Sequence, residues 1–182
     1  MYTDAVVVIV GPVLIAACLA LCGWAEYRKR LLRAGFGPEY DRVGREFGNT
    51  RAADRELIRR KRRHAALRLR LIGPSAQNGY ALLWKQVQRR FADDPSGAVL
   101  AAQGLVDEVV TARGYPVDQP GERLALLSVE HSYALAQYRK ANLAGERGRI
   151  GTATTEELRT ALAQFHLLFG ELLVTPRATW LR

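Results

Sequence analysis

Arg59 to Arg63 form the strongest chemical feature of the sequence, because five consecutive cationic side chains are followed there by His64. The guanidinium group presents a planar fork of N–H donors that matches the oxygens of phosphates and carboxylates. A second, shorter basic run occupies residues 28–30. We therefore predict that anions contact the residues of these two runs: Arg28, Lys29, Arg30, Arg59, Arg60, Lys61, Arg62 and Arg63.

The positive charge of the chain is concentrated between residues 28 and 70. The formal net charge is +9, and 15 of the 27 Lys and Arg residues lie in this stretch, against five Asp and Glu. Anionic lipid headgroups, nucleic acid and an acidic protein could each neutralise it, and a solvated stalk without a specific partner is the fourth interpretation. Lipid is favoured among the three partners, since each basic residue near an anionic membrane surface contributes about 1 kcal/mol.

No catalytic signature accompanies this charge. The histidines lack a second histidine or carboxylate at a spacing typical of metal sites, and they are His64, His131 and His166. The Gly145-x-x-Gly148-x-x-Gly151 pattern indicates a hinge, because it does not follow a strand and lacks the Gly-Lys-Ser/Thr of a phosphate loop. We predict surface, boundary or capping positions for the histidines, no catalytic, cofactor-binding or metal-binding residue, and no enzymatic activity.

Residues 5–24 form an apolar segment, with no charged side chain between Asp4 and Glu26. Such a segment, at about 1.5 Å rise per helical residue, spans about 30 Å, the thickness of the hydrocarbon core of a bilayer. Trp24 and Tyr27 lie at its C-terminal end, where amphipathic rings favour the membrane interface. We predict one transmembrane helix over residues 5–24, with Trp24 and Tyr27 as interface anchors.

A cleaved secretory signal peptide is the main alternative for this segment, and lipoprotein processing at Cys18 is the second. The residues before the apolar run include no Lys or Arg, and the run is longer than a typical signal core. Apolar residues also continue past Cys18, where a lipoprotein would turn polar. These features favour an uncleaved anchor.

The orientation follows from the basic residues after the apolar segment, because positively charged flanks stay in the cytoplasm. The N-terminal flank carries only the terminal amine and Asp4. We predict a single-pass protein of the cell membrane with its N-terminus outside and its C-terminal domain in the cytoplasm.

The fold is predicted to be all-α, since apolar residues from residue 36 onward recur at intervals of three and four, and no strand pattern occurs. The predicted parts are a short extracytoplasmic N-terminus (1–4), the transmembrane helix (5–24), a basic juxtamembrane helical segment (25–73), a compact helical bundle (74–174) and a C-terminal tail (175–182).

Proline, glycine and capping residues predict the helix boundaries. Helices are expected over about 38–47, 50–71, 76–91, 121–128 and 132–147. Asn49 or Thr50 caps the second of these and Ser75 the third, while Asp94 and Thr154 cap two further helices. The helix over 76–91 carries an apolar stripe expected to be buried: Tyr80, Leu83, Trp84, Val87 and Phe91.

Several stretches also carry a family pattern: FGPEYDR at 36–42, DDP at 93–95 after the helix ending at Phe91, RGYPVD at 113–118, LSVEH at 127–131 and TEELR at 155–159. They resemble a family of uncharacterised single-pass membrane or "secreted" proteins of high-GC Gram-positive bacteria, over the chain from the apolar segment to about residue 173. The family implies an apolar N-terminal helix with a basic flank, and no activity or cofactor. The chain departs from it at residues 78–80, where the family has a more charged helix start.

The anchor, the adjacent basic helix and a near-neutral bundle without catalytic groups favour a membrane-tethered interaction or scaffold protein, with the bundle as the module that binds a protein partner. A membrane-anchored nucleic-acid-binding protein is the alternative. It is disfavoured, because the aromatic residues fall in apolar stripes rather than among the charges, where bases could stack on them.

Overall fold

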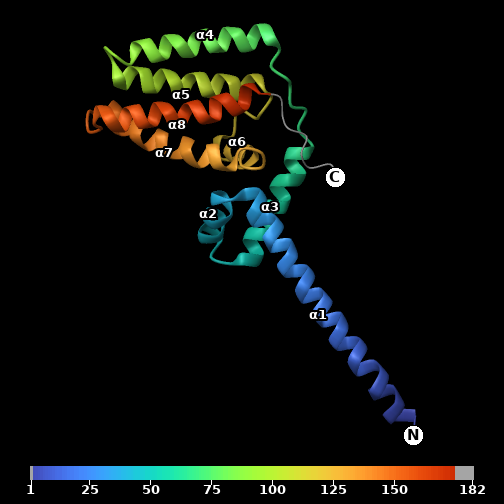
Figure 1. The fold of residues 1–182 in the computed structure, drawn as a ribbon. Helices are drawn as coiled ribbons and strands as arrows, with labels where there is room; N and C mark the ends of the chain where they lie inside the picture. Colours follow the sequence, from blue (N-terminus) through green and yellow to red (C-terminus); the bar gives the residue numbers. More distant parts are fainter. Residues whose placement is uncertain (1, 175–182) are drawn as a thin grey trace.

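The computed structural model describes the backbone of residues 2–174 and the side chains of residues 17–24 and 26–174 (Figure 1). Within residues 2–174 the fold is all-α, with eight helices and no strand, which confirms the predicted class. The helices are α1 (Tyr2–Phe36), α2 (Pro38–Phe47), α3 (Thr50–Ala65), α4 (Pro74–Arg90), α5 (Pro95–Ala112), α6 (Pro120–Leu127), α7 (Ser132–Arg149) and α8 (Thr155–Leu173).

Most helix boundaries lie where the capping residues, prolines and glycines of the sequence predicted them. Gly48 ends α2 in the left-handed conformation, with φ at 60°, and the Asn49 side chain accepts a hydrogen bond from the Arg51 N–H at 2.9 Å. Asp94 caps α5 through the Gly97 N–H at 2.8 Å, and Thr154 forms the predicted capping box at the start of α8. These boundaries need only neighbouring residues, so tertiary packing does not change them.

Two predicted boundaries were wrong. α4 begins at Pro74 with Gly73 as the N-cap residue, so Ser75 lies inside its first turn. α3 ends at Ala65 rather than near Leu71. The segment after it is extended, because Leu67 and Leu69 pack against the bundle and the Arg70 N–H donates to the Arg113 carbonyl at 2.8 Å.

Helices α4 to α8 form a bundle around one core. Figure 1 shows α4, α5, α8 and α7 stacked in that order, with the short α6 beside α7. The ring of Trp84 on α4 stacks on Phe169 of α8, with ring centroids 4.7 Å apart, and Tyr138 of α7 meets Phe165 of α8 edge-on at 5.4 Å. The outer helices are thereby held on the central pair α5 and α8.

Helices α1 to α3 have a small core of their own. Its members come from the C-terminal part of α1, from α2 and from α3, and are Leu32, Phe36, Tyr40, Val43, Ala53 and Leu57. α1 extends from this core away from the bundle (Figure 1). Its described apolar residues beyond the core are exposed, including Leu19 at 68% and Leu21 at 64%.

The predicted transmembrane segment falls mostly outside the described side chains. Among the residues that are described, no helix is long and apolar enough to cross a membrane. The side chains of residues 5–16 of the predicted span 5–24 are not described, nor are those of the predicted N-terminus 1–4 and of the predicted tail 175–182. α1 runs without a break to Phe36, so residue 24 is not a helix boundary and the basic run at 28–30 belongs to the same helix.

Candidate functional site

Four arginines surround an open hollow of about 310 Å³ between α1 and α3. Arg28 comes from α1, and Arg55, Arg59 and Arg62 come from α3, with Ile58 as the apolar lining residue. We call this hollow the arginine groove. No carboxylate is among the residues that line it.

The spacing of the α3 residues explains why they share the groove. Residues 58 and 59 each lie three or four positions from residues 55 and 62, so the four residues lie on one face of the helix. Ala53 and Leu57 on a neighbouring face are buried against Phe36 of α1. This packing holds the groove face of α3 beside Arg28.

The charge of the arginine groove is poorly compensated. In the described part of the chain, Arg55 and Arg62 have no carboxylate partner. Arg59 pairs with Glu56, which also pairs with Arg60 and Arg63, so one carboxylate is shared by three guanidinium groups. Arg28 lies over the ring of Trp24, 5.2 Å from its centroid. Several guanidinium forks thus face one hollow, which is an arrangement that binds phosphate or carboxylate oxygens.

The eight residues predicted to contact an anion separate into three groups: three line the arginine groove, three lie outside it on α1 and α3, and two lie toward the bundle. Arg28, Arg59 and Arg62 line the arginine groove, and Arg55, which the prediction omitted, joins them. Arg30 is exposed on α1, and Lys29 pairs with Glu26 at 2.7 Å. The exposed Lys61 lies over the ring of Phe36, 5.4 Å from its centroid.

Arg60 and Arg63 lie toward the bundle instead of the groove. The buried Arg60 donates to Glu56 at 2.9 Å and to the Ser128 hydroxyl at 3.5 Å. Arg63 donates to Glu122 of α6 at 2.7 Å. These two arginines attach α3 to the bundle, and the sequence run from 59 to 63 therefore serves two faces of one helix.

Glu39 makes a second polar attachment between the two parts of the fold. Its buried carboxylate accepts hydrogen bonds from Arg42 at 3.0 Å and from Arg139 of α7 at 3.2 Å. Burial lowers the pKa of Arg139, and the neighbouring Glu39 carboxylate opposes that shift. Ion pairs thus help to hold the arginine groove against the bundle, together with the apolar contact of Val129 with the core of α1 to α3.

The histidines pack against distant residues. His131 occupies the N-cap position of α7 without a side-chain capping bond, and its Nδ1 lies 2.7 Å from Glu171 of α8. His64 lies 3.4 Å from the Tyr115 hydroxyl, and burial lowers the pKa of its ring. Within the described residues, no group of three or more His, Cys, Asp or Glu is arranged to hold a metal ion.

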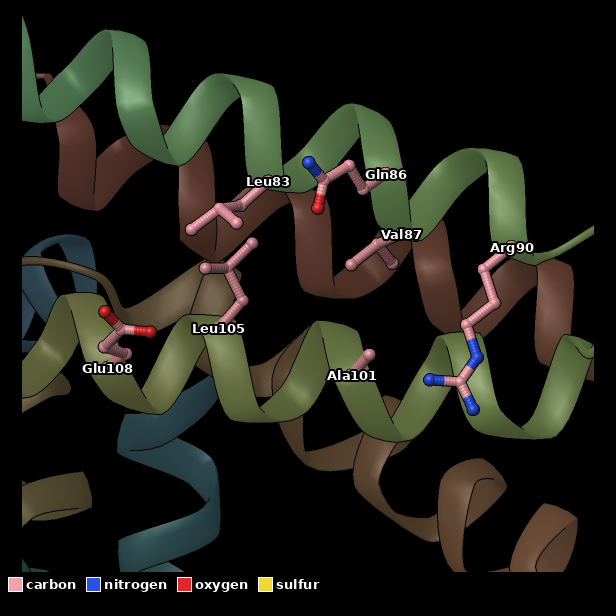
Figure 2. Close-up of a pocket in the computed structure, with 7 residues that line it drawn as sticks. All are labelled: Leu83, Gln86, Val87, Arg90, Ala101, Leu105 and Glu108. Atoms are coloured by element: carbon pink, nitrogen blue, oxygen red, sulfur yellow. The ribbon is translucent and has the colours of Figure 1, made fainter.

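A second hollow, of about 330 Å³, lies between α4 and α5 (Figure 2). Leu83, Val87 and Leu105 line its middle, while Arg90 and Glu108 lie toward opposite ends. Leu83 was predicted to be buried but is 40% exposed. The core takes Trp84 and Val87 from α4, and Leu83 is left at the edge of this α4/α5 groove.

In comparisons with known proteins, no protein family, curated protein or solved structure matches the chain. The resemblance in the sequence therefore stays an expectation. The geometry of the arginine groove is the basis for a functional proposal.

Proposed function

We propose that the protein is a membrane-tethered adaptor: α1 inserts into the cell membrane, the arginine groove contacts anionic headgroups, and the bundle binds a protein partner in the cytoplasm. The observation that carries the proposal is the position of the groove. Four arginines gather directly after the exposed apolar part of α1, at the level of Arg28. An inserted α1 would hold these charges at the headgroups of the cytoplasmic leaflet.

The exposed aromatic rings support the same arrangement. Trp24, about one turn before the basic run of α1, is 60% exposed, and Tyr27, directly before Arg28, is 61% exposed. Indole and phenol rings favour the boundary between headgroups and acyl chains. Trp24 would therefore mark the depth at which the apolar part of α1 ends.

Membrane attachment has a direct test in cells that express the full chain. We expect the protein to stay in the membrane pellet after washes with high salt and with alkaline carbonate, because an inserted helix resists both. A release by carbonate would leave only a peripheral attachment. Recovery of a shortened chain in the culture medium would support the signal-peptide alternative and would overturn the proposal.

The orientation is tested with two C-terminal fusions in the same cells. A fluorescent protein fused after residue 182 should fluoresce, and an alkaline phosphatase fused at the same point should stay inactive. The opposite pair of results would place the bundle outside the cell and would remove the cytoplasmic role.

The α4/α5 groove supports the partner-binding part of the proposal. Its apolar middle and its oppositely charged ends suit an amphipathic helix that lays its apolar face into the hollow (Figure 2). A photo-crosslinking residue at Leu83 should therefore react with one discrete partner polypeptide in membranes. The same residue at Leu143, which is 70% exposed on α7, is the control and should not. Equal crosslinking at both positions would contradict a partner site at α4 and α5.

A nucleic-acid role for the arginine groove is separated from the lipid role by binding assays at matched salt. The full chain in uncharged detergent is offered nucleic acid and anionic lipid separately. Tighter binding of the nucleic acid would favour the alternative function.

A further inference from the structure

We propose that the arginine groove is a binding site for one phospholipid whose headgroup is a phosphomonoester. The inference rests on the proposed membrane role and names the ligand class of the same site. It follows from the number of guanidinium groups, from the missing acidic partners and from the apolar surface next to the groove.

The charge of the groove fits a headgroup with more than one negative charge. Arg55 and Arg62 have no carboxylate partner in the described part of the chain, and Arg59 shares Glu56 with two other arginines. A phosphodiester carries one negative charge, whereas a phosphomonoester carries about −1.5 to −2 at pH 7 and presents three acceptor oxygens. Three terminal oxygens can accept from more than one guanidinium fork at once.

The apolar surface beside the groove fits the acyl chains of a lipid. Trp24 and Leu21 precede Arg28 by four and seven residues, so all three lie on one face of α1. Leu21 is 64% exposed and Trp24 is 60% exposed. A phosphate held by Arg28 therefore has an apolar track running from it along α1, which a soluble phosphate compound would leave unused.

The residues that line the groove favour a specific binding site over a general attraction between positive charges and an anionic surface. Arginine provides all four cationic side chains, and Ile58 is the one apolar residue among the described side chains that line the hollow. Guanidinium groups bind phosphate with a preferred geometry, whereas general attraction to an anionic surface depends on the number of charges and not on their place. Substitutions inside and outside the groove should therefore have different effects.

The test uses the full chain in uncharged detergent micelles, with one ligand added at a time. The ligands are short-chain phosphatidate, phosphatidylglycerol at a concentration that matches the total negative charge, and inorganic phosphate. Native mass spectrometry counts the bound lipids, and the shift in melting temperature gives the affinity. We expect one phosphatidate per chain, bound about tenfold or more tightly than phosphatidylglycerol, which is the size of effect that one additional charge-assisted hydrogen bond produces.

The decisive variant is R55Q/R62Q, and its matched control is K85Q/R89Q on the exposed surface of α4, far from the groove (Figure 1). Both variants remove the same charge. R55Q/R62Q should lose about tenfold or more of the affinity for phosphatidate, and K85Q/R89Q should keep it. Equal losses in both variants, or equal binding of the two lipids, would overturn the inference in favour of diffuse attraction.

The remaining outcomes also decide the question. Inorganic phosphate that binds as tightly as phosphatidate would overturn the lipid assignment. A chain that selects phosphatidate in micelles but is absent from cell membranes would refute the adaptor proposal and leave the inference standing. A chain that stays in membranes but binds the two lipids equally would refute the inference and leave the adaptor proposal standing.

Discussion

Glu56→Gln is expected to lower the free energy of unfolding by about 3 kcal/mol, because it leaves a buried guanidinium without its counter-charge. Glu56 is 7% exposed and Arg60 is 5% exposed, and their side chains are 2.9 Å apart. The amide oxygen of a glutamine can still accept a hydrogen bond from Arg60, but the negative charge is lost, and the other partner of Arg60 is the neutral Ser128 hydroxyl at 3.5 Å. Urea denaturation of the full chain in detergent, followed by circular dichroism, measures the change.

The matched control for this variant is Glu146→Gln. Glu146 is exposed on α7 and, among the described side chains, pairs with Arg149 alone, so the loss of its charge should leave the unfolding free energy unchanged within error. Equal effects of the two substitutions would show that the charges on α3 are as well hydrated as those on the surface, and that the ion pairs do not hold α3 against the bundle.

The pH dependence of the Glu56 effect has a defined sign. Burial raises the pKa of this carboxyl group, but the hydrogen bonds and positive charges of Arg59 and Arg60 together outweigh burial, so the pKa lies below the usual glutamate value. A carboxyl group with a lowered pKa in the folded state contributes stability above its unfolded pKa, about 4.3, and loses it as the pH falls through the folded pKa. The difference between the wild type and Glu56→Gln should therefore be constant above about pH 5 and should shrink below about pH 4.

Arg113→Met is expected to raise the free energy of unfolding by about 2 kcal/mol, which is an unusual result for a core substitution. Arg113 follows α5 and is 1% exposed, and none of its three side-chain nitrogens has a hydrogen-bond partner within the described residues. Arginine side chains stay charged in proteins, so the folded chain bears the full cost of removing this group from water. Methionine fills a similar volume without that cost.

The control for this variant is the same substitution at Arg123. Arg123 lies 3.3 Å from Asp107, and its side chain is 15% exposed, so Arg123→Met removes an ion pair and should not stabilise the fold. The backbone N–H and carbonyl of Arg113 keep their bonds to Val109 and Arg70 in the Met variant, so the measured change belongs to the side chain. A loss of stability in Arg113→Met would show that an anion compensates the guanidinium in the folded protein.

Several features of the fold depend on local chemistry, and the sequence predicts them correctly. Pro38 and Gly48 bound α2, and Asp94 and Thr154 cap α5 and α8 through residues three positions further on. The all-α class follows in the same way from the spacing of apolar residues. Each of these features involves atoms within about one helical turn, so the sequence alone contains the necessary information.

The division of the basic run between two faces of α3 was decided by the tertiary structure. In the sequence Arg59, Arg60 and Arg63 are equivalent, and only the position of Glu56 and of the bundle residues Glu122 and Ser128 draws Arg60 and Arg63 inward. Glu56 is four positions from Arg60, but Ser128 and Glu122 lie 68 and 59 positions from the arginines that they contact. No local pattern encodes the contacts with Ser128 and Glu122.

The end of α3 and the burial of Arg113 have the same origin. α3 stops at Ala65 because the residues after it pack against the bundle in an extended conformation, and the bond from the Arg70 N–H to the Arg113 carbonyl joins two segments that are far apart in the sequence. What the sequence by itself determined is which segments are helices, where most of them begin, and that the positive charge follows the apolar segment. Only the tertiary structure decided which arginines remain free to bind an anion, because that depends on which carboxylates and apolar surfaces the fold brings next to them.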